Sequence, residues 1–296
     1  MRRRRIQTSP MERAFTIFNY LFFAIVALLM ILPFWHVIMV SFSGVNEAQR
    51  GGLFLYPKGW NLNTYNTVFR NPMIYTGFAT TLMVTVSGTL IGVMVSALLA
   101  YALSKRHLRG GKLLMVLVLF TMVFNGGMIP NYMLIKSLGL IDNRLALVLP
   151  GLISAYNVII MKSYFETIPD AYDESAKIDG ANDLMIFFRI ILPLSGAMLA
   201  TVALFIAVGY WNDYFSSVLY INSTSKWSLQ AVLRNMLTNT AGAMAQAGVT
   251  VNVVQTISAT TVKAGSIVVA TVPILIVYPF LQKYFVKGVQ IGGVKG

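Results

Sequence analysis

Acidic residues are unevenly placed along this chain of 296 residues. Six of the ten, Glu166 to Asp183, lie within eighteen positions, although only 11% of the residues are charged. An ionised carboxylate is costly to remove from water unless it is paired. The segment is therefore expected to face water, and a concentration of charge in an otherwise apolar chain suggests that it faces a partner.

Motifs for chemistry within the chain itself are missing. No G-x-x-x-x-G-K-[ST] sequence occurs, so ATP is not expected to bind here through a P-loop. No H-E-x-x-H occurs, and the two histidines, His36 and His107, are interpreted as a packed residue and a member of a basic loop. The absence of cysteine excludes disulfides and thiol chemistry. The sequence thus predicts a protein that is not an enzyme and has no catalytic, metal or cofactor residues.

A second polar cluster, the run Tyr210, Trp211, Asn212 and Asp213, combines aromatic rings with an amide and an acid. Such groups suit sugars, because rings stack on C–H faces while amides and acids bond hydroxyls. The cluster is a candidate lining of a substrate path. Asp213 has an alternative interpretation as an interfacial residue in an aromatic belt.

These clusters must be positioned by membrane helices, because 56% of the residues are hydrophobic. The net charge of +13 is better explained by contact with anionic lipid than with nucleic acid. An all-α membrane protein is predicted, since only helices and closed barrels satisfy the backbone in lipid. Six candidate spans occur, the third of them short and interrupted by Gly and Pro: 14–42, 76–104, 113–130, 146–165, 195–215 and 264–286.

The distribution of basic residues predicts the orientation. Basic clusters precede the first span, follow the second at 105–112, and close the chain. The positive-inside rule places all of these in the cytoplasm, and with them both termini and the acidic segment 166–194. The predicted domains are a first span with an external segment (1–75), a five-helix core (76–287) and a cytoplasmic tail (288–296).

Within the acidic segment, the pattern predicts a helix, a tight turn and a second helix. Pro169 suits a helix start, and acids in the first turns favour the helix dipole. Gly180 can adopt the left-handed conformation that ends a helix, and Asn182 or Asp183 can cap the next one, which runs to Pro193. The two interpretations are a docking element for a basic protein surface and a solvated loop with an interfacial helix.

This segment resembles the EAA motif of ABC importer permeases. Glu174, Ser175 and Ala176 are followed at the family spacing by Gly180 and by Ile190, Leu192 and Pro193, with Ser175 as the one departure. Over essentially the whole chain, stretches such as "GYWNDYF" and "VYPFLQKYFVKGVQIGGVKG" are similar to the carbohydrate-uptake branch, which includes permeases for maltose and alginate.

The resemblance implies a type I importer permease in the bacterial inner membrane. Its expected partners are a second homologous permease, two ATPase subunits that bind ATP and Mg, an extracytoplasmic solute-binding protein, lipid and an oligosaccharide. It also implies a cytoplasmic coupling helix that docks on an ATPase through Asp173, Glu174, Ser175, Ala176, Asp179, Gly180 and Ala181.

Two questions stay open at this point. An ion-coupled secondary transporter is the alternative, although such proteins usually carry charged residues inside the membrane and these spans have almost none. The substrate is the other question, and an acidic sugar is a hypothesis that rests on five external basic residues: Lys136, Arg144, Lys226, Arg234 and Lys263.

Overall fold

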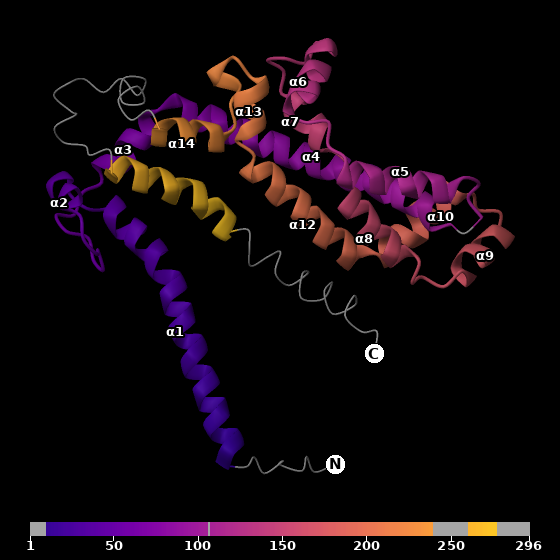
Figure 1. Cartoon of the computed structure of the whole chain (residues 1–296), viewed down its shortest axis with the longest axis horizontal. Helices are drawn as coiled ribbons and strands as arrows, with labels where there is room; N and C mark the ends of the chain where they lie inside the picture. The colour runs from indigo at the N-terminus through magenta and orange to yellow at the C-terminus, as the bar shows by residue number, and fades with distance from the viewer. Residues whose placement is uncertain (1–9, 106, 239–259, 277–296) are drawn as a thin grey trace. The chain divides into compact units, whose positions relative to one another are not determined.

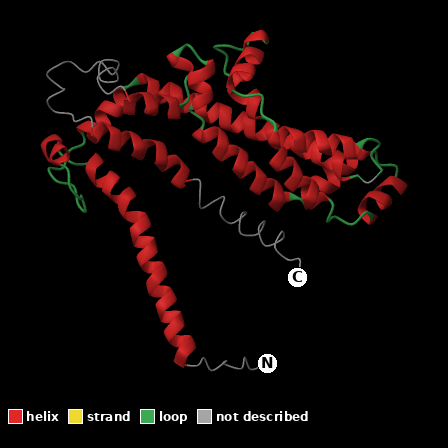
Figure 2. Cartoon of the chain, viewed as in Figure 1, coloured by secondary structure: helices red, strands yellow, loops and turns green. Residues whose placement is uncertain are grey.

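The structure, a computed structural model, describes residues 10–105, 107–238 and 260–276. In these ranges the regular elements are helices, and no strand occurs (Figure 2). The predicted tail 288–296 and the second half of the predicted last span lie outside the described residues. The chain divides into two units, one containing residues 10–70 and 260–269 and the other residues 71–238 and 270–276.

The first unit is dominated by α1 (Pro10–Ser41), a helix of 32 residues whose apolar side chains are almost all exposed (Figure 1). Only its last residues are buried, in a small core formed by Met39, Val40, Ala48, Phe54 and Ala264. His36 Nδ1 accepts a hydrogen bond from the Phe54 N–H at 3.0 Å, which confirms that His36 is a packing residue. The shorter helices of this unit are α2 (Val45–Arg50) and α3 (Asn63–Arg70).

The second unit is organised around α4 (Pro72–Ser104), which packs most extensively against α12 (Gly196–Asn212) and α8 (Ala155–Phe165) (Figure 1). Pro72 stands in the first turn of α4, and the Asn71 side chain caps the helix by accepting the Met73 N–H. Gly88 permits the close approach of α12, because a Cβ there would lie 2.5 Å from the Tyr210 ring.

Shorter elements complete this unit. They are α5 (Gly111–Val123), α6 (Met128–Ser137), α7 (Leu145–Val148), the 3₁₀ turn η1 (Leu149–Gly151), α9 (Ala171–Ile178), α10 (Asp183–Ile186), the π-helical turn η2 (Phe187–Ile191), α11 (Leu192–Leu194), α13 (Phe215–Tyr220), the 3₁₀ turn η3 (Thr224–Lys226) and α14 (Leu229–Thr238).

The membrane segments are less regular than six straight spans. In the described ranges, α1 and α4 are each long and apolar enough to cross, and three bent helix pairs raise the number to as many as five. The predicted span 113–130 is broken, because α5 ends at Val123 and α6 departs at 115°. The predicted last span begins as an apolar helix, Thr260–Ile276.

Candidate functional site

The acidic segment folds as a helix with a closed C-terminal cap. α9 ends at Ile178, and Asp179 is its C-cap residue. The next residue, Gly180, has a left-handed φ of +81°. The Gly180 N–H donates to the Lys177 carbonyl (3.0 Å) and the Ala181 N–H to the Ala176 carbonyl (2.9 Å). This pair of bonds is the Schellman motif, which satisfies carbonyls at the helix end. Glycine is required here by φ, since a Cβ would meet nothing within 4 Å.

The second helix begins at an amide cap. The Asn182 side chain accepts the Met185 N–H at 2.8 Å, so Asn182 and not Asp183 is the capping residue. The helix passes through η2, a π turn that widens the coil before Pro193. The predicted helix, turn and helix are therefore present, although the first helix starts at Ala171 and not at Pro169.

The seven predicted docking residues do not all point the same way. Glu174, Ser175, Asp179 and Gly180 are exposed. Ala176 is buried in the core of this chain, and Ala181 is half-buried against the same core. A small residue is needed at these two positions because the cap packs directly onto the unit.

Asp173, the remaining acid of this set, joins α9 to the end of α4. Its carboxylate forms an ion pair with Lys105 and accepts a hydrogen bond from the Tyr101 hydroxyl at 3.2 Å. The Lys105 ammonium also lies over the Tyr101 ring, 4.2 Å from its centroid. The side chains of Lys105 and Asp173 are only 16% and 18% exposed, so the pair is shielded from solvent. We call Tyr101, Lys105 and Asp173 the α4–α9 clamp.

The four predicted substrate-path residues differ in their contacts: Tyr210 and Asp213 form hydrogen bonds within the chain, whereas Trp211 and Asn212 line a cavity. The Tyr210 hydroxyl donates to the Val148 carbonyl at 2.8 Å, and its ring is buried against Gly88. Tyr210 therefore fastens α12 to α4 and to the end of α7. Asp213 shapes the following turn, because its carboxylate accepts the Ser216 N–H at 3.0 Å.

Trp211 and Asn212 line a cavity of about 300 Å³ with apolar walls. The Phe78 ring stands edge-on to the indole, with 6.1 Å between the ring centroids. The Trp211 Nε1–H and the Thr85 hydroxyl are buried and have no hydrogen-bond partner among the described residues. A buried donor without a partner is costly, so these two atoms are unusual in an otherwise apolar wall.

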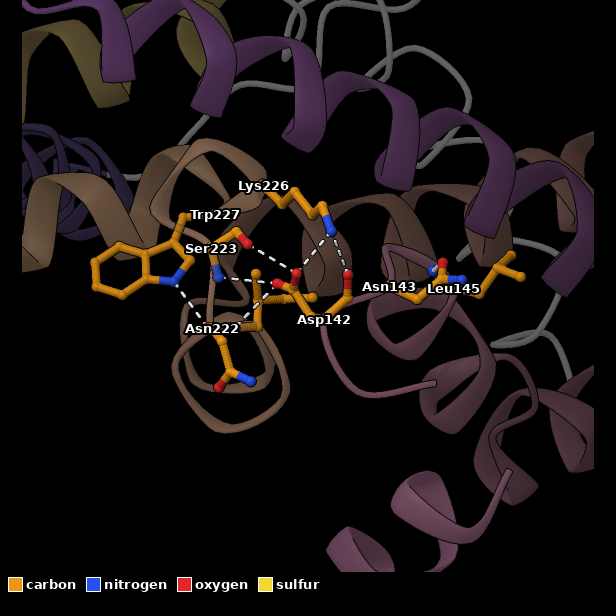
Figure 3. Close-up of polar contacts among 8 residues, drawn as sticks. Asp142, Asn143, Leu145, Asn222, Ser223, Lys226 and Trp227 are labelled. Atoms are coloured by element: carbon orange, nitrogen blue, oxygen red, sulfur yellow. Dashed lines mark hydrogen bonds and ion pairs between the residues drawn. The ribbon is translucent and has the colours of Figure 1, made fainter. Parts of the chain in front are cut away.

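A site that sequence reasoning missed lies at Asp142, which has the positive φ of 60° (Figure 3). Its carboxylate accepts the backbone N–H groups of Asn222 (3.1 Å) and Ser223 (2.8 Å) and the Ser223 hydroxyl (2.7 Å). Lys226 Nζ donates to one carboxylate oxygen at 2.7 Å and to the Asp142 carbonyl at 2.6 Å. The Lys226 hydrogen bond, followed by the Ser223 bonds, holds the pKa of Asp142 far below its usual range.

This Asp142 cluster ties the loop before α7 to the loop around η3. The partners lie 80 to 84 positions away in the chain, so no local pattern could have paired them. The only sequence signal is that an acid and a lysine occur in polar loops on the same predicted side of the membrane.

Comparison with known proteins assigns the architecture. The profile of the family described as "Binding-protein-dependent transport system inner membrane component" matches residues 1–291. The polygalacturonan/rhamnogalacturonan transport system permease protein YtcP of Bacillus subtilis (strain 168) is 45% identical over 288 residues, covering 96% of this chain and 99% of YtcP. The inner membrane ABC transporter permease protein YcjP of Escherichia coli (strain K12) is 30% identical and covers 92% and 94%.

A solved structure is similar as well. A chain in the crystal structure of a bacterial ABC transporter involved in the import of the acidic polysaccharide alginate superimposes with a TM-score of 0.85. The two sequences are 33% identical, and the match covers 95% of this chain and all of the other.

Proposed function

This chain belongs to the family of inner membrane components of binding-protein-dependent transport systems, and we propose that its exposed α9 cap couples it to an ATPase. It is a permease subunit of an ABC importer for oligosaccharides or polysaccharides. It is not itself catalytic, because ATP hydrolysis in this family belongs to separate ATPase subunits. The ion-coupled transporter is not favoured.

The proposal for α9 rests on one observation. The exposed surface of α9 and its C-terminal cap carries Glu174, Ser175 and Asp179, while the inner side is packed and clamped to α4. An acidic, outward-facing surface on a helix that is packed against α4 suits docking on a basic surface of an ATPase. Glu174 is the residue assigned to that contact, and the ATP and Mg of the cycle are held by the ATPase subunits.

The further partners are a second permease subunit, two ATPases and an external solute-binding protein. The family description supports the binding protein, and the exposed apolar length of α1 supports contact with lipid or with the second permease. Both termini and α9 are assigned to the cytoplasm by the positive-inside rule, with six crossings in all.

Trp211 and Asn212 are assigned to the substrate path, and Tyr210 and Asp213 to the framework that holds them. The support is the unpartnered Trp211 Nε1–H and Thr85 hydroxyl beside an apolar cavity that the Phe78 and Trp211 rings help to line. A sugar supplies both an apolar face for the rings and hydroxyls for these atoms. The names of the relatives, which concern polygalacturonan and alginate, favour an acidic saccharide.

The experiment is Glu174→Ala in the complex purified with its partner subunits. We expect normal insertion and assembly, with loss of most of the ATP hydrolysis that sugar-loaded binding protein stimulates. Ser175→Ala is the matched control, because it changes an equally exposed neighbour to the residue of the EAA pattern. Normal stimulated hydrolysis in Glu174→Ala would remove Glu174 from the coupling surface.

A further inference from the structure

We propose that Arg144 is the receptor for a carboxylate of the transported sugar, in a cavity separate from the one beside Trp211. The cavity has a volume of about 540 Å³ and is lined by Arg144, Lys226, Asn143, Ser87, Met83 and Val148, among others. This inference deepens the proposed function and rests on it, because it names the chemistry by which the permease selects its substrate.

The structure separates the five external basic residues by their surroundings. Lys226 is neutralised by Asp142, and Arg234 is exposed, with its guanidinium 4.1 Å from the centroid of the Tyr214 ring. Lys136 is exposed on α6, and Lys263 belongs to the other unit. Arg144 and Lys226 are both half-buried and line the cavity, and of these two only Lys226 has an acidic partner.

Arg144 has no acidic partner. All ten acidic residues lie in the described ranges, and none forms an ion pair with it. Asp142 also lines the cavity, but its carboxylate is already occupied by Lys226, Ser223 and the Asn222 N–H. The lining therefore keeps one uncompensated positive charge, on Arg144.

The two terminal nitrogens of the Arg144 guanidinium are available to bind a carboxylate. Arg144 Nε donates to the hydroxyl of Thr80, a buried residue of α4, at 3.2 Å. This bond fixes the plane of the group and leaves the terminal nitrogens, which make no hydrogen bond within the described part of the chain. Two parallel N–H groups of a fixed guanidinium match a carboxylate, and the hydroxyl of Ser87 and the amide of Asn143 can bond sugar hydroxyls.

The test uses the full importer complex in proteoliposomes with two probes, trigalacturonate and its methyl ester. The ester keeps the sugar rings and removes the charge. We expect Arg144→Gln to reduce import of trigalacturonate by roughly 10-fold or more, the cost of losing a charge-assisted pair, and to leave import of the ester nearly unchanged. Because every sample contains the same binding protein, its own preference cancels in the comparison of variants.

Two further variants sharpen the result. Arg144→Lys keeps the charge without the fork and should retain part of the acid preference, whereas Arg234→Gln should change neither rate. Equal loss for both probes in Arg144→Gln, or no loss for either, would overturn the inference. An equal loss that depends on the content of phosphatidylglycerol would assign the guanidinium to a lipid phosphate and would also overturn it.

The same assay distinguishes a failure of the proposed function from a failure of this inference. If the wild-type complex imports neither probe in an ATP-dependent manner and no other saccharide, the importer itself is refuted, together with this inference. If the wild type imports sugars with ATP but Arg144→Gln keeps the wild-type preference, only the inference fails.

Discussion

At Gly180 a single backbone angle determines the shape of the coupling segment. A φ of +81° costs a residue with a side chain roughly 1–2 kcal/mol, and no neighbouring atom would add a clash. We expect Gly180→Ala to lower the free energy of unfolding by about 1 kcal/mol and to weaken stimulated ATP hydrolysis, because the Schellman cap opens. Melting curves and ATPase assays of the purified complex measure both effects.

A matched glycine separates strain from the mere addition of a methyl group. Gly196 also has open space around its Cβ position but has no positive φ. Gly196→Ala should therefore leave stability and coupling unchanged or slightly improved. If Gly180→Ala behaved like Gly196→Ala, the cap would not depend on the left-handed turn.

Asp142 has a predicted pH dependence. The hydrogen bonds from Lys226 and Ser223 lower the folded-state pKa of Asp142, so its carboxylate stabilises the fold above the unfolded pKa of about 3.9. This contribution is lost as pH falls through the folded pKa. Asparagine tolerates the positive φ at this position, so Asp142→Asn removes the charge without adding backbone strain. We expect this variant to melt at a lower temperature than the wild type, by a constant amount between pH 8 and 5. The difference should shrink only below about pH 4.

Asp183→Asn supplies the comparison for this experiment. Asp183 is also paired with a lysine, Lys177 at 3.1 Å, but its side chain is 66% exposed. An exposed pair of this kind contributes little, so the variant should melt like the wild type at every pH. A difference for Asp142→Asn that disappeared already between pH 8 and 6 would point to another titrating group.

The α4–α9 clamp operates at the scale of elements, because it joins the coupling segment to the helix at the centre of the second unit. Removing one partner by Asp173→Asn or Lys105→Met should cost about 2 kcal/mol of contact energy, as expected for hydrogen bonds to charged groups. We expect the complex to hydrolyse more ATP for each sugar imported, since movement of α9 would no longer be transmitted fully to α4.

The charge-reversed double variant tests whether the contact itself matters. Lys105→Asp with Asp173→Lys keeps an ion pair between the same two positions and should recover part of the coupling that either single reversal loses. Lys177→Met, which breaks only the exposed pair at the tip of α9, should leave the ratio of ATP to sugar unchanged. Equal uncoupling in all variants would deny the clamp its mechanical role.

Features of the elements that depend on local patterns were predictable. The cap at Gly180 and the alternatives Asn182 or Asp183 for the next cap both follow from neighbouring residues. Tyr210 and Trp211 show the limit of such reasoning. They were grouped by adjacency, yet the Tyr210 hydroxyl is bonded to the Val148 carbonyl in the interior, and of these two residues only Trp211 lines the cavity beside Phe78.

Contacts across long stretches of chain could not be predicted. The clamp joins residues 68 positions apart, and the Asp142 cluster joins residues up to 84 positions apart. The sequence shows which charged residues need partners, but it does not show which residues pair with each other. The pairing depends on how the helices pack. Arg144 was one of five equivalent basic residues in the sequence, and only its bond to Thr80 and its cavity distinguish it.

For the molecule as a whole, the number of crossings depends on the broken third segment. α5 has 13 residues and rises about 20 Å, less than the ~30 Å of the hydrocarbon core. The four non-helical residues 124–127 add at most about 13 Å if extended, which is enough to complete one crossing. Asn125 supports this stretch by accepting the Gly127 N–H at 3.0 Å.

Because the chain has no cysteine, single cysteines can report this topology without background. Arg109→Cys, before α5, should react with an impermeant maleimide only from the cytoplasmic side, as should Glu174→Cys. Lys136→Cys, on the exposed side of α6, should react only from outside, as should Arg50→Cys. Labelling of positions 109 and 136 from the same side would mean that the 115° bend returns the chain without crossing, and the number of crossings would be odd.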